Sequence, residues 1–190
     1  MPSGYVRPRV GWGGHHGGVV QSVELLLDRA RDAAVRARWD RLRGAGLPSQ
    51  ARHTGASNAP HVTLAAREAI DPGAEPGLRA AVAGLPMPLR LGALACFGRG
   101  RFVLVRLVVP GAQLLALHAA VAHVLGPDPH GLRNLAPGEW TPHVTLARRL
   151  TGEQVARALG ELDGAGEQTG AAVGCRRWDG ATRTEWSLLT

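Results

Sequence analysis

Short apolar runs alternate with helix-like stretches along most of the chain. Five segments rich in Val, Leu and Ala predict β-strands: 19–27, 89–97, 101–109, 171–178 and 182–189. Four segments with apolar residues at helical spacing predict helices: 28–45, 76–83, 111–125 and 152–162. Asp28 is a candidate N-cap, and Thr151 with Gln154 has the spacing of a capping box.

Two further predicted strands have almost the same sequence. Residues 60–67 are PHVTLAAR and residues 142–149 are PHVTLARR, a repeat of eight residues with one difference. The predicted elements around each copy also follow one order: strand, helix, octapeptide strand, helix, strand, with an extra strand at the end. We therefore predict an α+β fold built by pseudo-symmetric duplication. It is bilobal, each lobe being an antiparallel sheet with helices outside, and a central cleft lies between the lobes.

Each octapeptide contains one imidazole and one hydroxyl, two residues apart. Side chains two apart on a strand share a face, so His61 lies beside Thr63 and His143 beside Thr145. If the copies pack symmetrically, the two imidazoles face each other across the cleft. Such a pair can divide acid and base work on a phosphodiester near neutral pH, while the hydroxyls donate hydrogen bonds to phosphate oxygens.

Strand alternation also makes a prediction for the arginines that end the two motifs. Arg67 and Arg149 fall on the histidine face, about 20 Å along the strand from their histidines at roughly 3.3 Å per residue. Arg148 falls on the opposite face. None of the three is assigned to the site.

Other interpretations of these residues remain open at this stage. A single His-x-Thr on a strand is usually structural, and it is the second copy that favours a functional role. Zinc requires three or four ligands, and neither a His-x-x-x-His motif nor a pair of nearby cysteines supplies them, so no metal site is predicted. Trp140 either stacks on a base or simply packs, and His53 lies in a loop that could approach a substrate.

The charge and composition of the chain exclude some catalytic mechanisms and bear on the kind of partner. The 190 residues have a net charge of +7, and all 22 basic residues are arginine. Without lysine, the chain cannot use a phosphate-binding-loop lysine, a Schiff base or a lysyl-nucleotide intermediate. The basic excess suits a phosphate-bearing partner, although a preference for arginine also follows from a GC-rich genome.

Length and apolar patterning predict a flexible Gly-rich tail over 1–18 and a single bilobal domain over 19–190. The chain has neither an apolar run of 18 residues nor an apolar signal core, so neither a membrane span nor a signal peptide is expected. Cys96 and Cys175 are isolated and are expected to be buried thiols. We expect a cytoplasmic monomer.

The sequences His61-Val62-Thr63-Leu64 and His143-Val144-Thr145-Leu146 resemble the paired His-x-Thr motifs of the two-histidine (2H) phosphoesterase superfamily. The nearest branch is the 2′-5′ RNA ligase and cyclic phosphodiesterase group, and Trp140-Thr141-Pro142 is similar to its run-in to the second motif. The likeness spans about 19–189 and leaves the N-terminal tail unexplained.

This resemblance implies hydrolysis of a 2′,3′-cyclic phosphate, on an RNA end or a nucleotide, to a 2′-phosphate without metal or cofactor. Reversal of related chemistry would be 2′-5′ RNA ligation without ATP. His61 would protonate the leaving 3′ oxygen and His143 would activate water, while Thr63 and Thr145 hold the phosphate oxygens. A non-catalytic RNA-binding module that uses the same cleft and a hydrolase of small-molecule cyclic phosphates are the alternatives.

Overall fold

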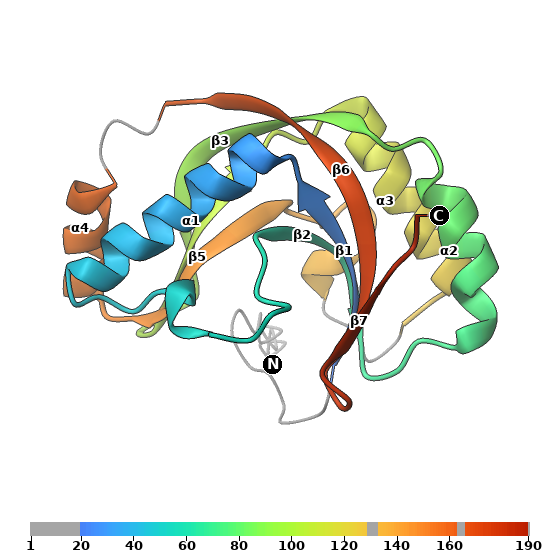
Figure 1. The fold of residues 1–190 in the computed structure, drawn as a ribbon, viewed down its shortest axis with the longest axis horizontal. Coiled ribbons are helices and arrows are strands. Elements are labelled where there is room, and N and C mark those ends of the chain that lie inside the picture. The colour runs from blue at the N-terminus through green and yellow to red at the C-terminus, as the bar shows by residue number, and fades with distance from the viewer. Residues whose placement is uncertain (1–19, 129–132, 163–165, 190) are drawn as a thin grey trace, which may run out of the picture.

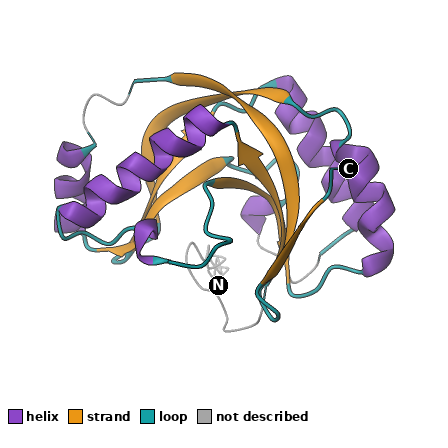
Figure 2. Ribbon diagram, in the orientation of Figure 1, coloured by secondary structure: helices purple, strands orange, loops and turns teal. Residues whose placement is uncertain are grey.

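The computed structural model describes residues 20–128, 133–162 and 166–189, so the predicted tail over 1–18 lies outside the described residues. Helices and strands alternate around one antiparallel sheet (Figures 1 and 2). Their order is β1 (Gln21–Leu27), α1 (Arg29–Gly44), β2 (His61–Arg67), α2 (Glu75–Val82), β3 (Met87–Phe97), β4 (Phe102–Val108), α3 (Ala112–Leu125), β5 (His143–Leu150), α4 (Gly152–Glu161), β6 (Gln168–Asp179) and β7 (Thr184–Ser187). This order of elements is the one predicted from the sequence.

The strands lie in the order β2-β1-β6-β3-β4-β5, and β7 pairs with β6. The two predicted lobes are therefore β2-β1-β6 and β3-β4-β5, and the pairing of β3 with β6 joins them into one continuous sheet. Each lobe takes two strands from one half of the sequence and its third strand from the other half. In Figure 1, α1 and α4 lie at the end of the sheet near β5, whereas α2 and α3 lie at the other end.

The core lies between the sheet and its helices, and the motif strands contribute alternate residues to it. Val62, Leu64, Val144 and Leu146 are all at most 1 % exposed, whereas His61 keeps part of its surface accessible. Burying such a side chain contributes roughly 1.5–3 kcal/mol. Burial of the apolar residues therefore fixes the face on which the histidines lie.

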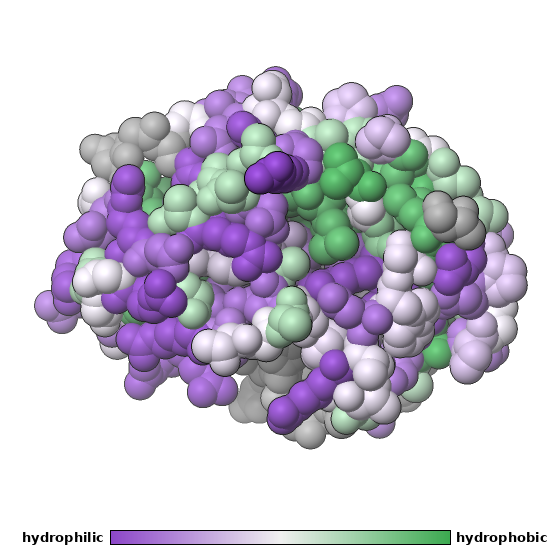
Figure 3. Space-filling model, in the orientation of Figure 1, coloured by the Kyte–Doolittle hydropathy of each residue, from purple (hydrophilic) through white to green (hydrophobic). Residues whose placement is uncertain are grey.

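Local signals set the helix boundaries as expected. The Asp28 carboxylate accepts a hydrogen bond from the Arg31 amide at the start of α1, and Thr151 with Gln154 forms a complete capping box at the start of α4. On the face shown in Figure 3, arginine-rich α1 makes a hydrophilic surface, and apolar residues gather on the neighbouring surface over β6. Among the described residues, no helix has the length and apolar character needed to cross a bilayer.

The expectation of two buried thiols is wrong for one cysteine. Cys175 is buried in β6, and burial raises the pKa of its thiol to about 12. Cys96 is exposed, because it lies near the end of β3, where alternation turns its side chain to solvent.

Candidate active site

The two motif strands are the two ends of the sheet path. β2 and β5 each pair with only one strand of that path, and the sheet curves until they contact each other (Figure 1). The structure thus brings together two segments that are about 80 residues apart in the sequence. The two copies of the octapeptide are thus neighbours in the fold.

Each motif strand contains an irregularity directly after its threonine. The pairing of β1 with β2 skips Leu64, which follows Thr63. The pairing of β4 with β5 skips Leu146, which follows Thr145. An unpaired extra residue of this kind is a β-bulge, and it reverses the alternation of side chains beyond it.

The bulges overturn the prediction for two arginines. Arg67 leaves the histidine face and donates a hydrogen bond of 2.7 Å to the Leu125 carbonyl at the end of α3. Arg148 instead joins the histidine face, where its charge lowers the pKa of His143. Simple alternation could not reveal this, since nothing in the octapeptide marks where a bulge will form. Arg149 has a left-handed backbone with φ of 63°.

Both imidazoles are held in the same way. Nδ1 of His61 lies 2.8 Å from the Ala59 carbonyl oxygen, and Nδ1 of His143 lies 2.7 Å from that of Thr141. A carbonyl oxygen only accepts, so in each ring Nδ1 carries the hydrogen and donates it. Nε2 is then the nitrogen of each ring that can exchange a proton with a substrate.

His143 lies in an apolar environment. Its ring meets the edge of Phe97, with ring centroids 5.0 Å apart and planes at 72°. Burial lowers the pKa of His143, the hydrogen bond to the Thr141 carbonyl opposes that shift, and the charges of Arg148 and His61 lower it further. The last contribution shows that the two rings are close enough to interact electrostatically.

His61 borders a cavity of about 540 Å³ that is lined largely by polar and charged residues. The loop over 53–58, which includes His53, forms one wall, and the remaining lining consists of Glu24, Arg176, Trp178, Arg183 and Glu185. Sequence analysis missed Glu24 and Arg176. The signal that could have found Glu24 is a single carboxylate inside an otherwise apolar strand, between Val23 and Leu25.

The motif threonines are anchored through their backbone rather than through their side chains. The indole of Trp140 donates a hydrogen bond of 3.1 Å to the Thr63 carbonyl, and that of Trp39 donates one of 3.0 Å to the Thr145 carbonyl. Within the part of the chain that the structure describes, neither threonine hydroxyl has a hydrogen-bond partner. Both hydroxyls are therefore available to a ligand.

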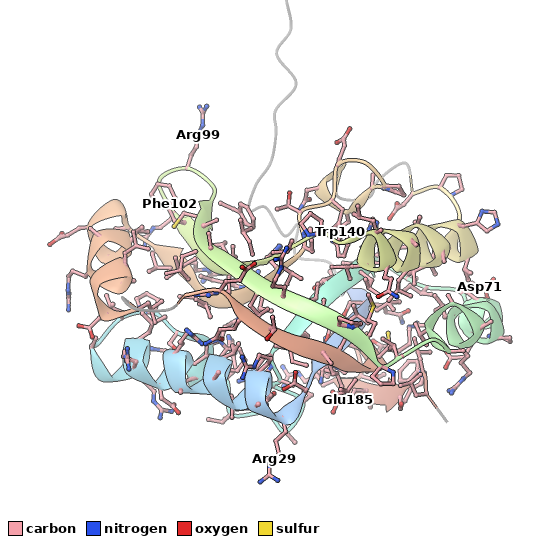
Figure 4. All side chains as sticks on the ribbon, turned by 90° about the horizontal axis from the view of Figure 1, so that it is seen from above. Arg29, Asp71, Arg99, Phe102, Trp140 and Glu185 are labelled. Atoms are coloured by element: carbon pink, nitrogen blue, oxygen red, sulfur yellow. The ribbon has the colours of Figure 1, made fainter. Side chains whose placement is uncertain are left out.

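Trp140 is a packing residue. It is 9 % exposed, and its ring stacks on that of His118 in α3, with centroids 4.0 Å apart and planes at 4°. Figure 4 shows its position beside α3. Of the two roles considered for Trp140, the structure favours packing over stacking on a base.

We expect Trp140→Phe to lower the free energy of unfolding by about 1–3 kcal/mol, because it leaves the Thr63 carbonyl without its donor. Denaturant unfolding measures this. Trp186→Phe is the matched control, since the indole of Trp186 bonds Glu75 at a 37 % exposed site and its loss should cost less than about 1 kcal/mol. Equal effects of the two substitutions would contradict the anchoring role of Trp140.

Comparison with known proteins identifies the family of this chain. The family model described as the 2′-5′ RNA ligase superfamily matches residues 31–179. The chain belongs to that superfamily. The resemblance carried by the two His-x-Thr motifs is thereby confirmed, and membership supports a phosphoesterase activity in general. A comparison with curated protein sequences gives no match.

Solved structures show the same fold at low sequence identity. Kluyveromyces marxianus Usb1 with uridine monophosphate is 10% identical with a TM-score of 0.53, and the match covers 89% of this chain and 97% of that one. E. coli LigT complexed with 3′-AMP is 17% identical with a TM-score of 0.50, and the match covers 89% of this chain and 96% of that one.

Proposed function

We propose that this protein hydrolyses a 2′,3′-cyclic phosphate, on an RNA end or a nucleotide, to a 2′-phosphate by paired-histidine catalysis without metal. The observation that supports the proposal is that the two motif histidines lie on strands that contact each other and have the same hydrogen-bonded orientation but different surroundings. The Usb1 and LigT structures hold uridine monophosphate and 3′-AMP, which supports a nucleotide ligand for the same fold.

In the proposed reaction, Nε2 of His143 takes a proton from water, whose oxygen attacks the phosphorus. The bond from phosphorus to the 3′ oxygen breaks, and His61 donates its Nε2 proton to that oxygen. The hydroxyls of Thr63 and Thr145 donate hydrogen bonds to the non-bridging oxygens, where negative charge grows. The proton gained by His143 and the proton lost by His61 return through solvent, so both residues are restored.

The assay is incubation with a 2′,3′-cyclic nucleotide and with an RNA that bears the same end, with separation of the 2′- and 3′-phosphate products. Formation of the 2′-phosphate supports the proposal. Salt-sensitive binding of the RNA without any product would overturn it in favour of the non-catalytic RNA-binding module.

Removal of metal ions with EDTA is expected to leave the rate of hydrolysis unchanged, since every proton transfer in the proposed reaction is made by an imidazole. Within the described ranges, no group of three or more His, Cys, Asp or Glu side chains could hold a metal ion. The measurement is turnover before and after dialysis against EDTA. Loss of activity that added Zn²⁺ or Mg²⁺ restores would contradict the proposed chemistry.

A further inference from the structure

The two halves of the site differ at one pair of equivalent positions. Thr63 pairs across the sheet with Glu24, whereas Thr145 pairs with Val105. One strand further in, Glu24 pairs with Arg176, and its counterpart Val105 pairs with Ala95. On the strands next to the first motif, the cross-strand neighbours of its threonine are thus a carboxylate and a guanidinium. At the second motif the equivalent neighbours are two apolar side chains.

Glu24 divides its two oxygens between different partners. It is 5 % exposed, and its Oε2 accepts a hydrogen bond of 2.8 Å from Nε of Arg176 and lies 2.8 Å from Nη2 of the same guanidinium in an ion pair. Its Oε1 accepts a hydrogen bond of 2.6 Å from the Ser22 hydroxyl and lies 3.6 Å from Nε2 of His61. The last distance is too long for a hydrogen bond, so the carboxylate attracts a protonated ring while leaving its Nε2 proton free for transfer.

The charges of Glu24, Arg176, Glu185 and His61 balance in only one protonation state of His61. Arg176 also pairs with Glu185 through Nη1, so one guanidinium stands between two carboxylates. A positive charge on His61 makes the sum of these four side chains zero. Glu24 and Arg176 are buried, where uncompensated charge is costly, whereas His61 is half-buried and Glu185 is exposed, so a positive charge on the ring matches the carboxylate that faces it.

Other titratable groups also face this cluster. Burial raises the pKa of Glu24, but the charges of His61 and Arg176 and the hydrogen bond from Ser22 outweigh it, so the pKa is lowered and the carboxylate is ionised. The neighbouring thiol of Cys175 stays neutral, because burial raises its pKa to about 12. Arg183 and His53 line the cavity that opens beside His61.

We propose that Glu24 is a positioning residue whose carboxylate, 3.6 Å from Nε2 of His61, stabilises the positively charged form of that ring and thereby helps to decide which of the two motif histidines is the acid. This rests on the proposed function. The leaving oxygen of the substrate must then face the cavity beside His61, and the attacking water must face the apolar surroundings of His143. The duplicated motif alone does not determine in which direction the substrate binds, since its two copies contain the same histidine and threonine side chains.

The decisive test is the titration of the histidine ring signals by NMR in Glu24→Gln. We expect the pH at which the His61 signals change to be lower than in the wild type, because the carboxylate that lies 3.6 Å from its Nε2 has lost its negative charge. Ser22→Ala is the matched control, since it removes one hydrogen bond from the same carboxylate and keeps its charge. Glu24→Asp, which restores a carboxylate, should move the His61 titration back towards that of the wild type.

Kinetics give a second readout. Glu24→Gln should lower kcat for a 2′,3′-cyclic nucleotide by about 10-fold or more at pH 8 and shift the alkaline limb of the pH profile to lower pH. A p-nitrophenyl phosphodiester has a leaving group that needs no proton. The kcat for its hydrolysis by Glu24→Gln should therefore differ from that of the wild type by less than about 3-fold. Equal losses with both substrates, together with an unchanged His61 titration, would show that Glu24 is only structural.

A wild-type protein without activity on either substrate would sink the proposed function, but the NMR titration would still decide the role of Glu24. If Glu24→Gln does not fold, the double variant Glu24→Gln, Arg176→Gln removes the guanidinium that has lost one of its two carboxylate partners, and its His61 titration is compared with that of Arg176→Gln. An unshifted His61 titration in that variant would overturn the proposal.

Discussion

His143→Ala and His61→Ala are each expected to lower turnover of a 2′,3′-cyclic nucleotide by at least ~10²-fold, the range typical of removing a general base or acid. His123→Ala is the matched control, because His123 is an exposed histidine on α3 and its replacement should leave the rate unchanged. Circular dichroism checks that each variant is folded. Full activity in either of the first two variants would rule out paired-histidine catalysis.

The same pair predicts a bell-shaped pH profile whose acidic limb reports His143. A base must be neutral to accept a proton, and burial lowers the pKa of His143 below the ordinary 6.5. The acidic limb of kcat/KM should therefore lie below pH 6.5, and the rate should fall as the pH drops through that limb. An acidic limb above pH 7 would contradict the assignment of His143 as the base.

Thr145→Val and Thr63→Val are each expected to lower kcat by about 10²–10³-fold, the cost of removing one fixed donor to a developing oxyanion. Valine keeps the shape of the side chain and removes only the hydroxyl. Thermal unfolding should change little, because in the described structure these hydroxyls bond no other residue.

Thr169→Val is the control for the threonine variants, since Thr169 is an exposed threonine on β6. It should leave kcat unchanged. Wild-type turnover in both motif variants would contradict the role of the threonines as phosphate-binding donors.

The elements and the repeat could be predicted because the signals behind them are local. A capping box at Thr151 or a period-two strand is specified by a few neighbouring residues. His61 and Thr63 share a face because both precede the bulge in β2, so alternation holds between them.

Features that depend on long-range pairing could not be predicted. The bulges after Thr63 and Thr145 depend on how β2 pairs with β1 and how β5 pairs with β4. Because of them, the predicted faces of Arg67 and Arg148 were wrong. The contact of Glu24 with Arg176 joins residues 152 positions apart, and no spacing rule connects them. The duplicated motif therefore identifies the site, while the difference between its halves becomes visible only in three dimensions.

The exchange of β3 and β6 between the lobes has a consequence for how such a molecule could arise. A half-length ancestor with one motif could complete its lobe with its own last strand or with that of a second copy, and an exchange of last strands between two copies would give the pairing seen here. Gene fusion would then convert a strand-swapped homodimer into one polypeptide, after which the two motif copies could diverge in their neighbours while keeping the same eight-residue signature.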